Sequence, residues 1–536
     1  MSLKNQHRFN RATYFALFAV LFGLIFARYC YFGFEYFYQM DDYIQYHNYK
    51  AFNPDLWGLI ASLGMLSNRP LAGLCDLFIW SNFYNCMIVA VGIISAMYAA
   101  SALLLHRVFS KHFGTGFLFF VIYALLPLGF EGAYWVSASS RIIVGLFFAS
   151  LALFFFEGWC EKGKAHRLLL FVGLQLIAFC FYEQVVLFSG AATLIIMLLN
   201  LKSRNRRALW GFLMFLNAAI YFALTKLAPT GVYSGRTTLI LPWQAGYMEL
   251  CFLPAGAQML ESFISGGFAT CGKGLVRGFE IIFSQPNILF ILVILLLCAA
   301  FLLIGRKTKR EKIRFLPALF SGLFLTLAPL LLFFVLKDPW FGVRNALCSF
   351  CGLALMADAL LGLVLRRFSK APKIEAWIAT VLALLCCVAA VSELHDYRET
   401  TLADKQIASA AGQALENEDF SDHRPILLLN VDASYVKNAN FYFHDHGYGV
   451  TGSDWAMTGA VRALSGRGKI PMLTPISKYR SFAIPKDNSK MFFYSQGEFV
   501  PVSPEETKDG WRLKDSGGTI LGELLFSQGS ANLRVK

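Results

Sequence analysis

Charged residues are scarce in this chain. Asp, Glu, Lys and Arg make up 15% of the 536 residues, whereas hydrophobic residues make up 57%. A soluble globular domain carries about 25% charged residues, so this composition excludes an ordinary soluble protein of this length. Long apolar runs stand in place of the missing charge, and runs near 20 residues are typical of membrane-spanning helices. The sequence therefore predicts a polytopic α-helical membrane protein.

Two further features are missing. No small-residue cleavage site follows the first apolar run, which is too long for a cleavable signal, so we interpret it as a signal-anchor span. Most of the twelve cysteines lie inside predicted spans and the C-terminal tail has none, so they read as small hydrophobic residues of the membrane core. Cys251 and Cys271 share one predicted outer loop, and a disulfide between them is left open.

Basic residues outnumber acidic ones, 48 to 34, which by itself would also suit a nucleic-acid-binding protein. They occur, however, in short clusters between the apolar runs, which is the positive-inside pattern of membrane proteins. Nucleic acid is therefore not an expected partner, whereas membrane lipid is.

About eleven spans are predicted, and the basic clusters orient them. The spans are 12–33, 83–105, 115–130, 142–159, 168–182, 185–201, 208–227, 286–305, 315–336, 345–365 and 375–392. Segments assigned to the cytoplasm hold 22 basic residues, and the intervening short segments hold five. This bias places the N-terminus in the cytoplasm and the tail outside. It also divides 168–201 into two spans with Glu183 at their outer turn.

The chain is predicted to divide into a membrane domain, 1–393, and an extracytoplasmic domain, 394–536. The tail contains an amphipathic helix candidate at 403–418, a strand at 425–431, a helix at 456–466, and strands near 480–485 and 490–502. Helices mixed with short strands predict a small α/β domain.

Conspicuous polar residues gather in the predicted outer loops, which are 34–82, 130–141, 228–285 and 337–345, with a short turn at 181–184. Charged groups close to the membrane are costly and are usually functional. The candidate substrate-binding residues are Arg69, Tyr134, Trp135, Arg141, Glu183, Arg236, Trp340 and Arg344. Each arginine could instead be an interfacial anchor, and each tryptophan a member of the aromatic belt. Arginine is nevertheless the side chain best suited to grip phosphate with a planar fork, and tryptophan can stack on a sugar ring.

Asp41 and Asp42 form an acidic pair directly after the first span. They could be ordinary solvated acids, but their closeness to the membrane favours a functional role. Adjacent side chains diverge by about 100° on a helix and about 180° on a strand. We therefore expect one carboxylate to face the reacting atoms, with Asp41 preferred, and the other to orient it, cap a helix or bind a metal.

These features together resemble the GT-C superfamily of membrane glycosyltransferases. The resemblance lies in the acidic pair at the start of the first outer loop, the number of spans and the outer C-terminal domain. The stretch "SNRPLAG" (67–73) and the aromatic-Ser-Arg second loop are similar to the bacterial branch with GtrII-type glucosyltransferases. The tail matches no known domain of that family.

The resemblance implies a bacterial plasma-membrane enzyme that takes a sugar from a polyprenyl-phosphate donor. An acidic residue of the first outer loop, Asp41 or Asp42 here, would deprotonate a glycan, lipid or protein acceptor, with inversion at the sugar carbon. Some members use a divalent metal, so Mg or Mn on Asp41, Asp42 and Glu183 stays open. The alternatives are a transporter or flippase of lipid-linked glycan, a polysaccharide polymerase or ligase, and a receptor whose active part is the tail.

Overall fold

The computed structural model describes residues 11–232, 238–308, 313–368, 371–431, 449–486, 488–527 and 529–535. Their contacts divide the chain into two compact units. The helical unit contains residues up to 35, 57–79 and 85–394; the tail unit contains 36–56, 80–84 and the chain from 395 onward. The division near residue 394 lies inside one long helix, α18 (Ala371–Ala414).

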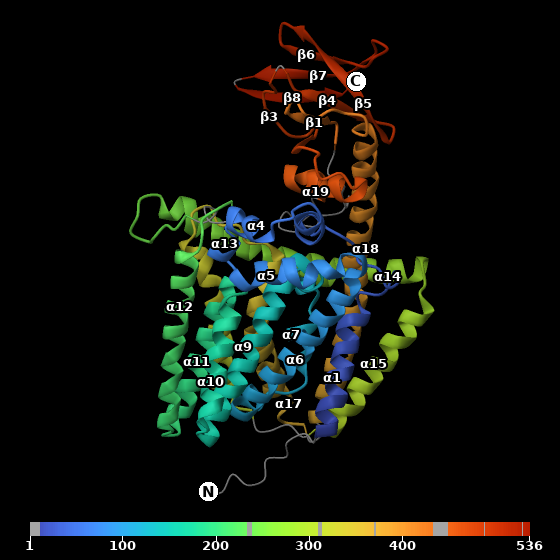
Figure 1. Ribbon diagram of the computed structural model, residues 1–536. Coiled ribbons are helices and arrows are strands. Elements are labelled where there is room, and N and C mark those ends of the chain that lie inside the picture. Colours follow the sequence, from blue (N-terminus) through green and yellow to red (C-terminus); the bar gives the residue numbers. More distant parts are fainter. Residues whose placement is uncertain are drawn as a thin grey trace. The chain divides into compact units, whose positions relative to one another are not determined.

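The helical unit is a bundle of helices that lie side by side (Figure 1). They are α1 (Arg11–Ala27), α6 (Met87–Phe113), α7 (Leu118–Ala124), α8 (Phe130–Tyr134), α9 (Val136–Lys162), α10 (Ala165–Phe179), α11 (Glu183–Lys202), α12 (Leu213–Leu227), α15 (Ile288–Lys307), α16 (Phe315–Leu327), α17 (Phe350–Leu365) and α18. Within the described residues, eight helical stretches are long and apolar enough to cross a membrane. Three shorter apolar stretches, Arg11–Ala27, Leu118–Tyr134 and Ala165–Phe179, lie where three further spans are predicted, and the total of eleven stays a prediction.

Glycines and one proline mark the ends of these helices. α6 and α9 each stop at a glycine in the left-handed conformation, Gly114 (φ 71°) and Gly163 (φ 65°), which a residue with a side chain adopts only with strain. Between α7 and α8 the helix breaks at 125–129, where Pro127 lacks the N–H that a continuous helix would need.

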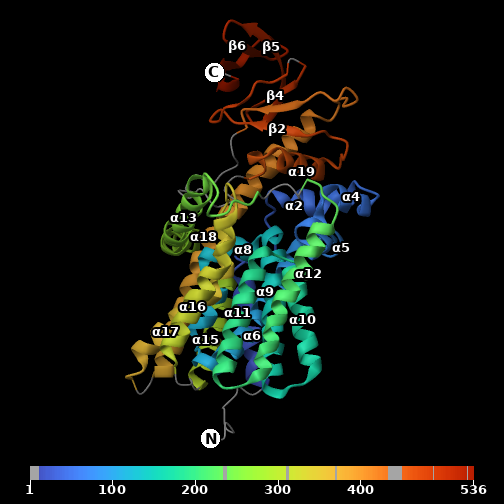
Figure 2. The same ribbon diagram turned by 90° about the vertical axis from the view of Figure 1, so that its left-hand side faces the viewer.

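Shorter helices lie across one end of the bundle (Figures 1 and 2). The sequence predicts 34–82 and 228–285 as outer loops. The structure instead forms α4 (Leu56–Leu63) and α5 (Pro70–Phe78) in the first, and a helical run Met248–Ser284 in the second. The run consists of η6 (Met248–Phe252), α13 (Leu253–Leu260), η7 (Glu261–Ser265), η8 (Phe268–Lys273) and α14 (Gly274–Ser284).

The tail unit is built on a mixed sheet of eight strands among the described residues. The strands are β1 (Ile426–Leu429), β2 (Leu473–Ile476), β3 (Phe482–Ala483), β4 (Lys490–Ser495), β5 (Glu498–Thr507), β6 (Gly510–Lys514), β7 (Ile520–Ser527) and β8 (Ser530–Val535). Their order is β2-β1-β4-β5-β6-β7-β8-β3, with β1 parallel to both of its neighbours and the other pairs antiparallel. Ile426 and Leu428 join one buried apolar cluster and Leu427 and Leu429 the other, so β1 is covered on both faces.

The predicted tail elements are present, and the structure differs from the prediction in other respects. The predicted helix at 403–418 is not separate, because it forms the end of α18; α19 (Asp454–Ser465) matches the second predicted helix. The antiparallel strands after residue 510 were not predicted. Segment 36–56, assigned to the membrane domain, packs in the tail unit, where Tyr43 joins the apolar cluster of α18 and α19.

Candidate functional site

The end of the bundle that carries α5, α8 and the start of α11, here called the site end, holds most of the predicted site residues. Arg69, just before α5, donates from Nε to both carboxylate oxygens of Glu183, at 3.0 and 2.9 Å. The guanidinium carbon of Arg69 also lies 4.5 Å from the ring centre of Tyr182. About a third of the Arg69 side chain is exposed, so the pair holds the guanidinium in place without covering it.

A buried polar network joins this pair to Arg344. The hydroxyl of Tyr182 accepts a hydrogen bond from Asn345 Nδ2 at 2.6 Å, and Gln184 Nε2 donates to the carbonyl of Asn345 at 3.2 Å. The turn between α10 and α11 and the 343–349 segment are therefore fixed together by side chains that the sequence analysis did not single out.

Arg344 lies on an aromatic face. Its guanidinium carbon is 5.1 Å from the ring centre of Trp135, a cation–π contact. Gly132 allows this approach, because a Cβ there would come within 2.9 Å of the Arg344 carbonyl oxygen. Trp135 is 2% exposed, and its indole N–H is buried without an acceptor. A buried donor without a partner costs free energy, so this N–H beside a guanidinium is a place where an acceptor oxygen would be stabilised.

A second arginine pair lies at the start of α9. Arg141 Nη2 donates to Asp76 Oδ2 at 2.7 Å, and Arg141 Nη1 donates to Ser137 Oγ at 2.9 Å. Asp76 is buried near the end of α5. Asp76 could have been selected as a candidate from the sequence, because it is an acid seven residues after Arg69 in an otherwise apolar helix.

Arg28 is a buried arginine that the sequence analysis did not select as a candidate. It is 1% exposed, donates from Nη1 to the Leu125 carbonyl at 3.1 Å where α7 ends, and donates from Nη2 to the Tyr29 hydroxyl at 2.6 Å. It was counted as part of the first apolar run, because one charge among many hydrophobic residues does not change a hydropathy pattern. Its contact with the carbonyl at the helix break shows a role in stabilising that break.

The acidic pair belongs to the tail unit. Asp42 is fully buried, and its Oδ2 accepts from the Tyr36 hydroxyl at 2.7 Å and from the Gln39 N–H at 2.9 Å. Asp41 is half-buried. Asp42 is thus held by two local hydrogen bonds, and Asp41 is the more accessible carboxylate.

The remaining predicted residues differ in accessibility. Tyr134 is buried against Tyr29 and Phe130, so neither its ring nor that of Trp135 offers the open face that stacking on a sugar requires. Trp340 is 48% exposed and keeps this possibility. Arg236 lies outside the described residues.

The structure also bears on the possible metal site and on the possible disulfide. Among the described residues, no group of three or more His, Cys, Asp or Glu side chains is arranged to hold a metal ion. Both oxygens of Glu183 face Arg69 instead. Cys251 and Cys271 are both free, so the disulfide considered for them is not formed.

No protein-family model matches the chain, and no curated protein is significantly similar to it. The fold defines a mostly helical protein whose described residues include eight stretches long and apolar enough to cross a membrane, with ordered arginine contacts at one end of the bundle.

Proposed function

We propose that this protein is a membrane glycosyltransferase of the GT-C type. It transfers a sugar from a polyprenyl-phosphate donor to a glycan, lipid or protein acceptor at the non-cytoplasmic face of a bacterial plasma membrane. Eleven spans, a cytoplasmic N-terminus and an extracytoplasmic tail belong to this proposal.

The observation that carries the proposal is Arg344 stacked on Trp135 beside a buried indole N–H without an acceptor. A phosphate leaving group gains negative charge as the sugar departs, and preoriented donors at that position lower the barrier. Arg69, held by Glu183 and still partly exposed, is a second cation at the same end of the bundle. Both are guanidinium groups, whose planar forks match phosphate oxygens.

Asp41 is the general base of the proposed reaction. Its carboxylate takes the proton from the acceptor hydroxyl while that oxygen bonds to the anomeric carbon. The bond from that carbon to the donor phosphate breaks, and the polyprenyl phosphate leaves with the electron pair. Asp42, already accepting two hydrogen bonds, holds the segment that carries Asp41.

A transporter of lipid-linked glycan is the alternative from another class. Such proteins place binding groups on broken helices near the bilayer midplane. In the middle of the described helices, the buried carboxylate of Asp358 accepts a hydrogen bond from the Gly116 N–H at 2.9 Å, and the neutral side chains of Gln175 and Asn217 bond to each other at 2.9 Å. The Gln175–Asn217 contact joins α10 to α12, as interhelical polar contacts commonly do, and does not favour a transport site.

The decisive experiment combines purified protein, a panel of radiolabelled polyprenyl-phosphate sugars and extracted cell-envelope acceptors. We expect Asp41→Asn to abolish transfer at normal protein level. Asp42→Asn should mainly lower thermal stability, because it alters a buried carboxylate that accepts two hydrogen bonds. Full activity of Asp41→Asn would refute the base assignment, and label appearing across a vesicle without transfer would favour the transporter.

A further inference from the structure

The helical run Met248–Ser284 has the position of a surface helix. It connects the candidate spans Arg206–Leu227 and Ile288–Lys307. Figure 1 shows it lying across the site end of the bundle, and Figure 2 shows its α13 part end-on. At 1.5 Å per residue the run is roughly 50 Å long, well over the ~30 Å hydrocarbon core, and both of its ends meet the same end of the bundle.

One face of the run packs on the bundle. The buried residues recur at helical spacing: Ala255, Met259, Ser262, Thr270, Gly274 and Gly278. Gly278 meets α18 so closely that a Cβ would lie 2.1 Å from the Val388 carbonyl oxygen. Two glycines four residues apart are the small-residue pattern that lets helices approach within a membrane.

A second face is exposed and apolar. Leu260, Ile264 and Phe268 follow one another at steps of four, and Val276, Phe279 and Phe283 continue the row at steps of three and four. Their exposures range from 39% for Phe279 to 81% for Phe283. A contiguous apolar row of this length on a soluble protein would be an aggregation liability.

Polar residues mark a third flank. Lys273, Arg277 and Glu280 follow at steps of four and three, and so share one side of the helix. A helix with one packed face, one exposed apolar face and one charged flank is typical of the membrane–water interface.

The apolar row continues the exposed surfaces of the two flanking spans. Phe222 and Leu227 at the end of α12, and Ile288 and Leu292 at the start of α15, are exposed and apolar. These surfaces must face lipid if the helices cross a membrane. The row has the same exposed apolar side chains as these surfaces. Hydrocarbon is therefore the occupant that fits the whole surface.

The packed side of the run also holds part of the candidate site. Gln258 Oε1 accepts from the Phe341 N–H at 2.8 Å, and the Asp338 N–H donates to the Leu250 carbonyl at 2.8 Å. Phe341 lies three residues before Arg344. Three π-helical turns, η6, η7 and η8, interrupt the run, and such turns are uncommon and often occur at functional sites.

We infer that Met248–Ser284 is an interfacial helix, whose row Leu260–Phe283 is covered by lipid acyl chains and whose opposite side positions the 338–341 segment. This inference does not depend on glycosyl transfer. It assigns a lipid-binding surface to a region that composition alone identifies only as a connection.

Photo-crosslinking tests this surface directly. The photoreactive residue p-benzoyl-phenylalanine replaces Phe268 or Phe279 in the full chain, which is reconstituted in vesicles of phosphatidylethanolamine and phosphatidylglycerol and irradiated. We expect lipid adducts, identified by mass, at both positions. A matched probe at buried Met259 should give an intramolecular product. A second matched probe at exposed Tyr479 of the tail unit should give no lipid adduct.

Two outcomes would overturn the inference. Adducts between two copies of the chain at Phe268 and Phe279 would assign the row to an oligomer interface. A failure of both probes to capture lipid, with the Met259 control still giving its intramolecular product, would show that acyl chains do not cover the row.

Discussion

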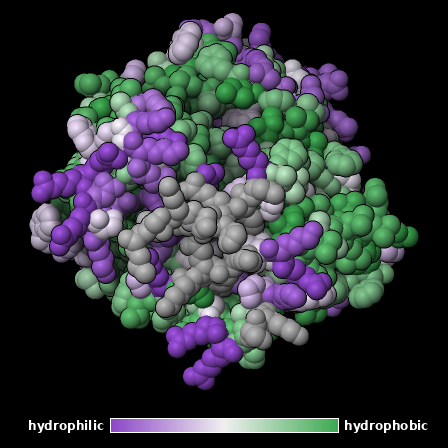
Figure 3. All heavy atoms as spheres, turned by 90° about the horizontal axis from the view of Figure 1, so that it is seen from below, coloured by the Kyte–Doolittle hydropathy of each residue, from purple (hydrophilic) through white to green (hydrophobic). Residues whose placement is uncertain are grey.

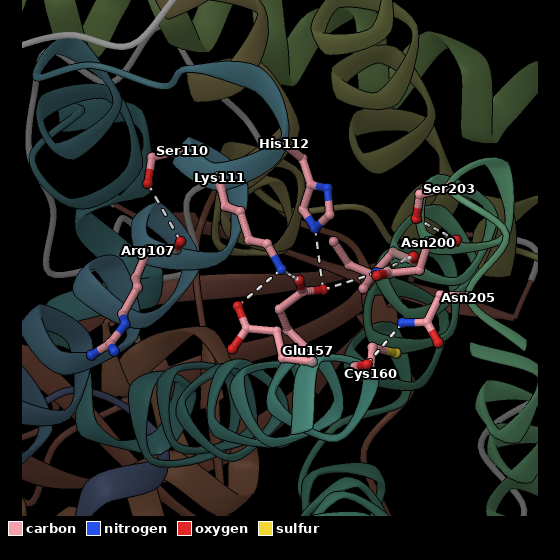
Figure 4. Close-up of polar contacts among 11 residues, drawn as sticks. Arg107, Ser110, Lys111, His112, Glu157, Cys160, Asn200, Ser203 and Asn205 are labelled. Carbon is pink, nitrogen blue, oxygen red and sulfur yellow. Dashed lines mark hydrogen bonds and ion pairs between the residues drawn. The ribbon is translucent and has the colours of Figure 1, made fainter. Parts of the chain in front are cut away.

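The two ends of the helical unit both contain buried charge, but they neutralise it differently. The end opposite the site is here called the basic end. There, Lys111 Nζ donates to Oε1 of Glu157 on α9, and Glu157 Oε2 lies 3.1 Å from His112 Nε2 and 3.0 Å from Asn200 Nδ2 (Figure 4). At the site end the indole N–H of Trp135 and the Nε of Arg28 are buried without acceptors. At the basic end one carboxylate shared by a lysine, a histidine and an asparagine ties α6, α9 and α11, whereas the site end holds arginines against rings and a carboxylate and buries the Trp135 indole N–H without an acceptor.

The surfaces of the two ends differ as well. Figure 3 views the molecule from the basic end and shows hydrophilic side chains gathered there among hydrophobic ones. The exposed basic residues at this end include Lys162, Lys164, Lys202, Arg204, Arg206, Arg207, Arg306, Lys307, Arg366 and Arg367. These exposed cations suit the cytoplasmic side of a membrane protein, whereas the guanidinium groups of the site end are held by rings and carboxylates.

The largest effect is expected at Arg344. Arg344→Ala removes the cation stacked on Trp135, and we expect transfer to fall by about 100-fold, as when one transition-state donor is lost. Arg344→Lys keeps the charge but not the planar fork, and should recover little. Initial rates of sugar transfer, normalised to folded protein, measure both. If the alanine variant works at the normal rate, Arg344 takes no part in transfer.

Glu157→Gln should show the opposite pattern. This change leaves Lys111 and His112 beside a neutral amide, and we expect the free energy of unfolding to fall by about 2 kcal/mol. The transfer rate per folded molecule should not change, because the basic end does not touch substrate in the proposal. Thermal unfolding in detergent and the transfer assay separate the two effects. Loss of rate at unchanged stability would mean that the basic end takes part in function.

Sequence reasoning predicted this contrast only in part. Hydropathy and the basic clusters located the helices, since burying apolar side chains and placing cations between spans are local properties of the chain. Glu157 went unnoticed because its partners come from α6 and α11, 45 or so positions away in either direction, and nothing local in the sequence signals that approach.

The candidate site was predictable by residue type and not by partner. Arg69, Arg141 and Arg344 were singled out for their place in predicted loops, and each has an ordered contact. Their partners Asp76, Tyr182 and Trp135 depend on how α5, α9 and α11 meet. The acids of the first loop show the limit of the method: both looked alike in sequence, and only burial distinguished Asp42 from Asp41.

Exchanging the charges of the Arg69–Glu183 pair distinguishes a structural role of the pair from a role in binding the substrate. In Glu183→Gln the guanidinium of Arg69 loses its carboxylate, and we expect a stability loss of about 1 kcal/mol, since the pair is partly exposed. The double variant Arg69→Glu/Glu183→Arg should regain that stability without regaining transfer, because the cation then comes from a different backbone position. Unfolding midpoints and rates of the three proteins test this. Equal rescue of both quantities would show that the pair is only structural.

The smallest effect is expected at Glu161, the second acid that contacts Lys111, at 2.9 Å. Its side chain is 27% exposed against 7% for Glu157, so water replaces most of what Glu161→Gln removes. We expect a loss below about 0.5 kcal/mol, in the range of ordinary surface ion pairs. Glu161→Gln is therefore the matched control for Glu157→Gln, with the same chemistry one helical turn away. If the two variants lose equal stability, the buried network is worth no more than a surface contact, and the two ends of the bundle differ less than their geometry indicates.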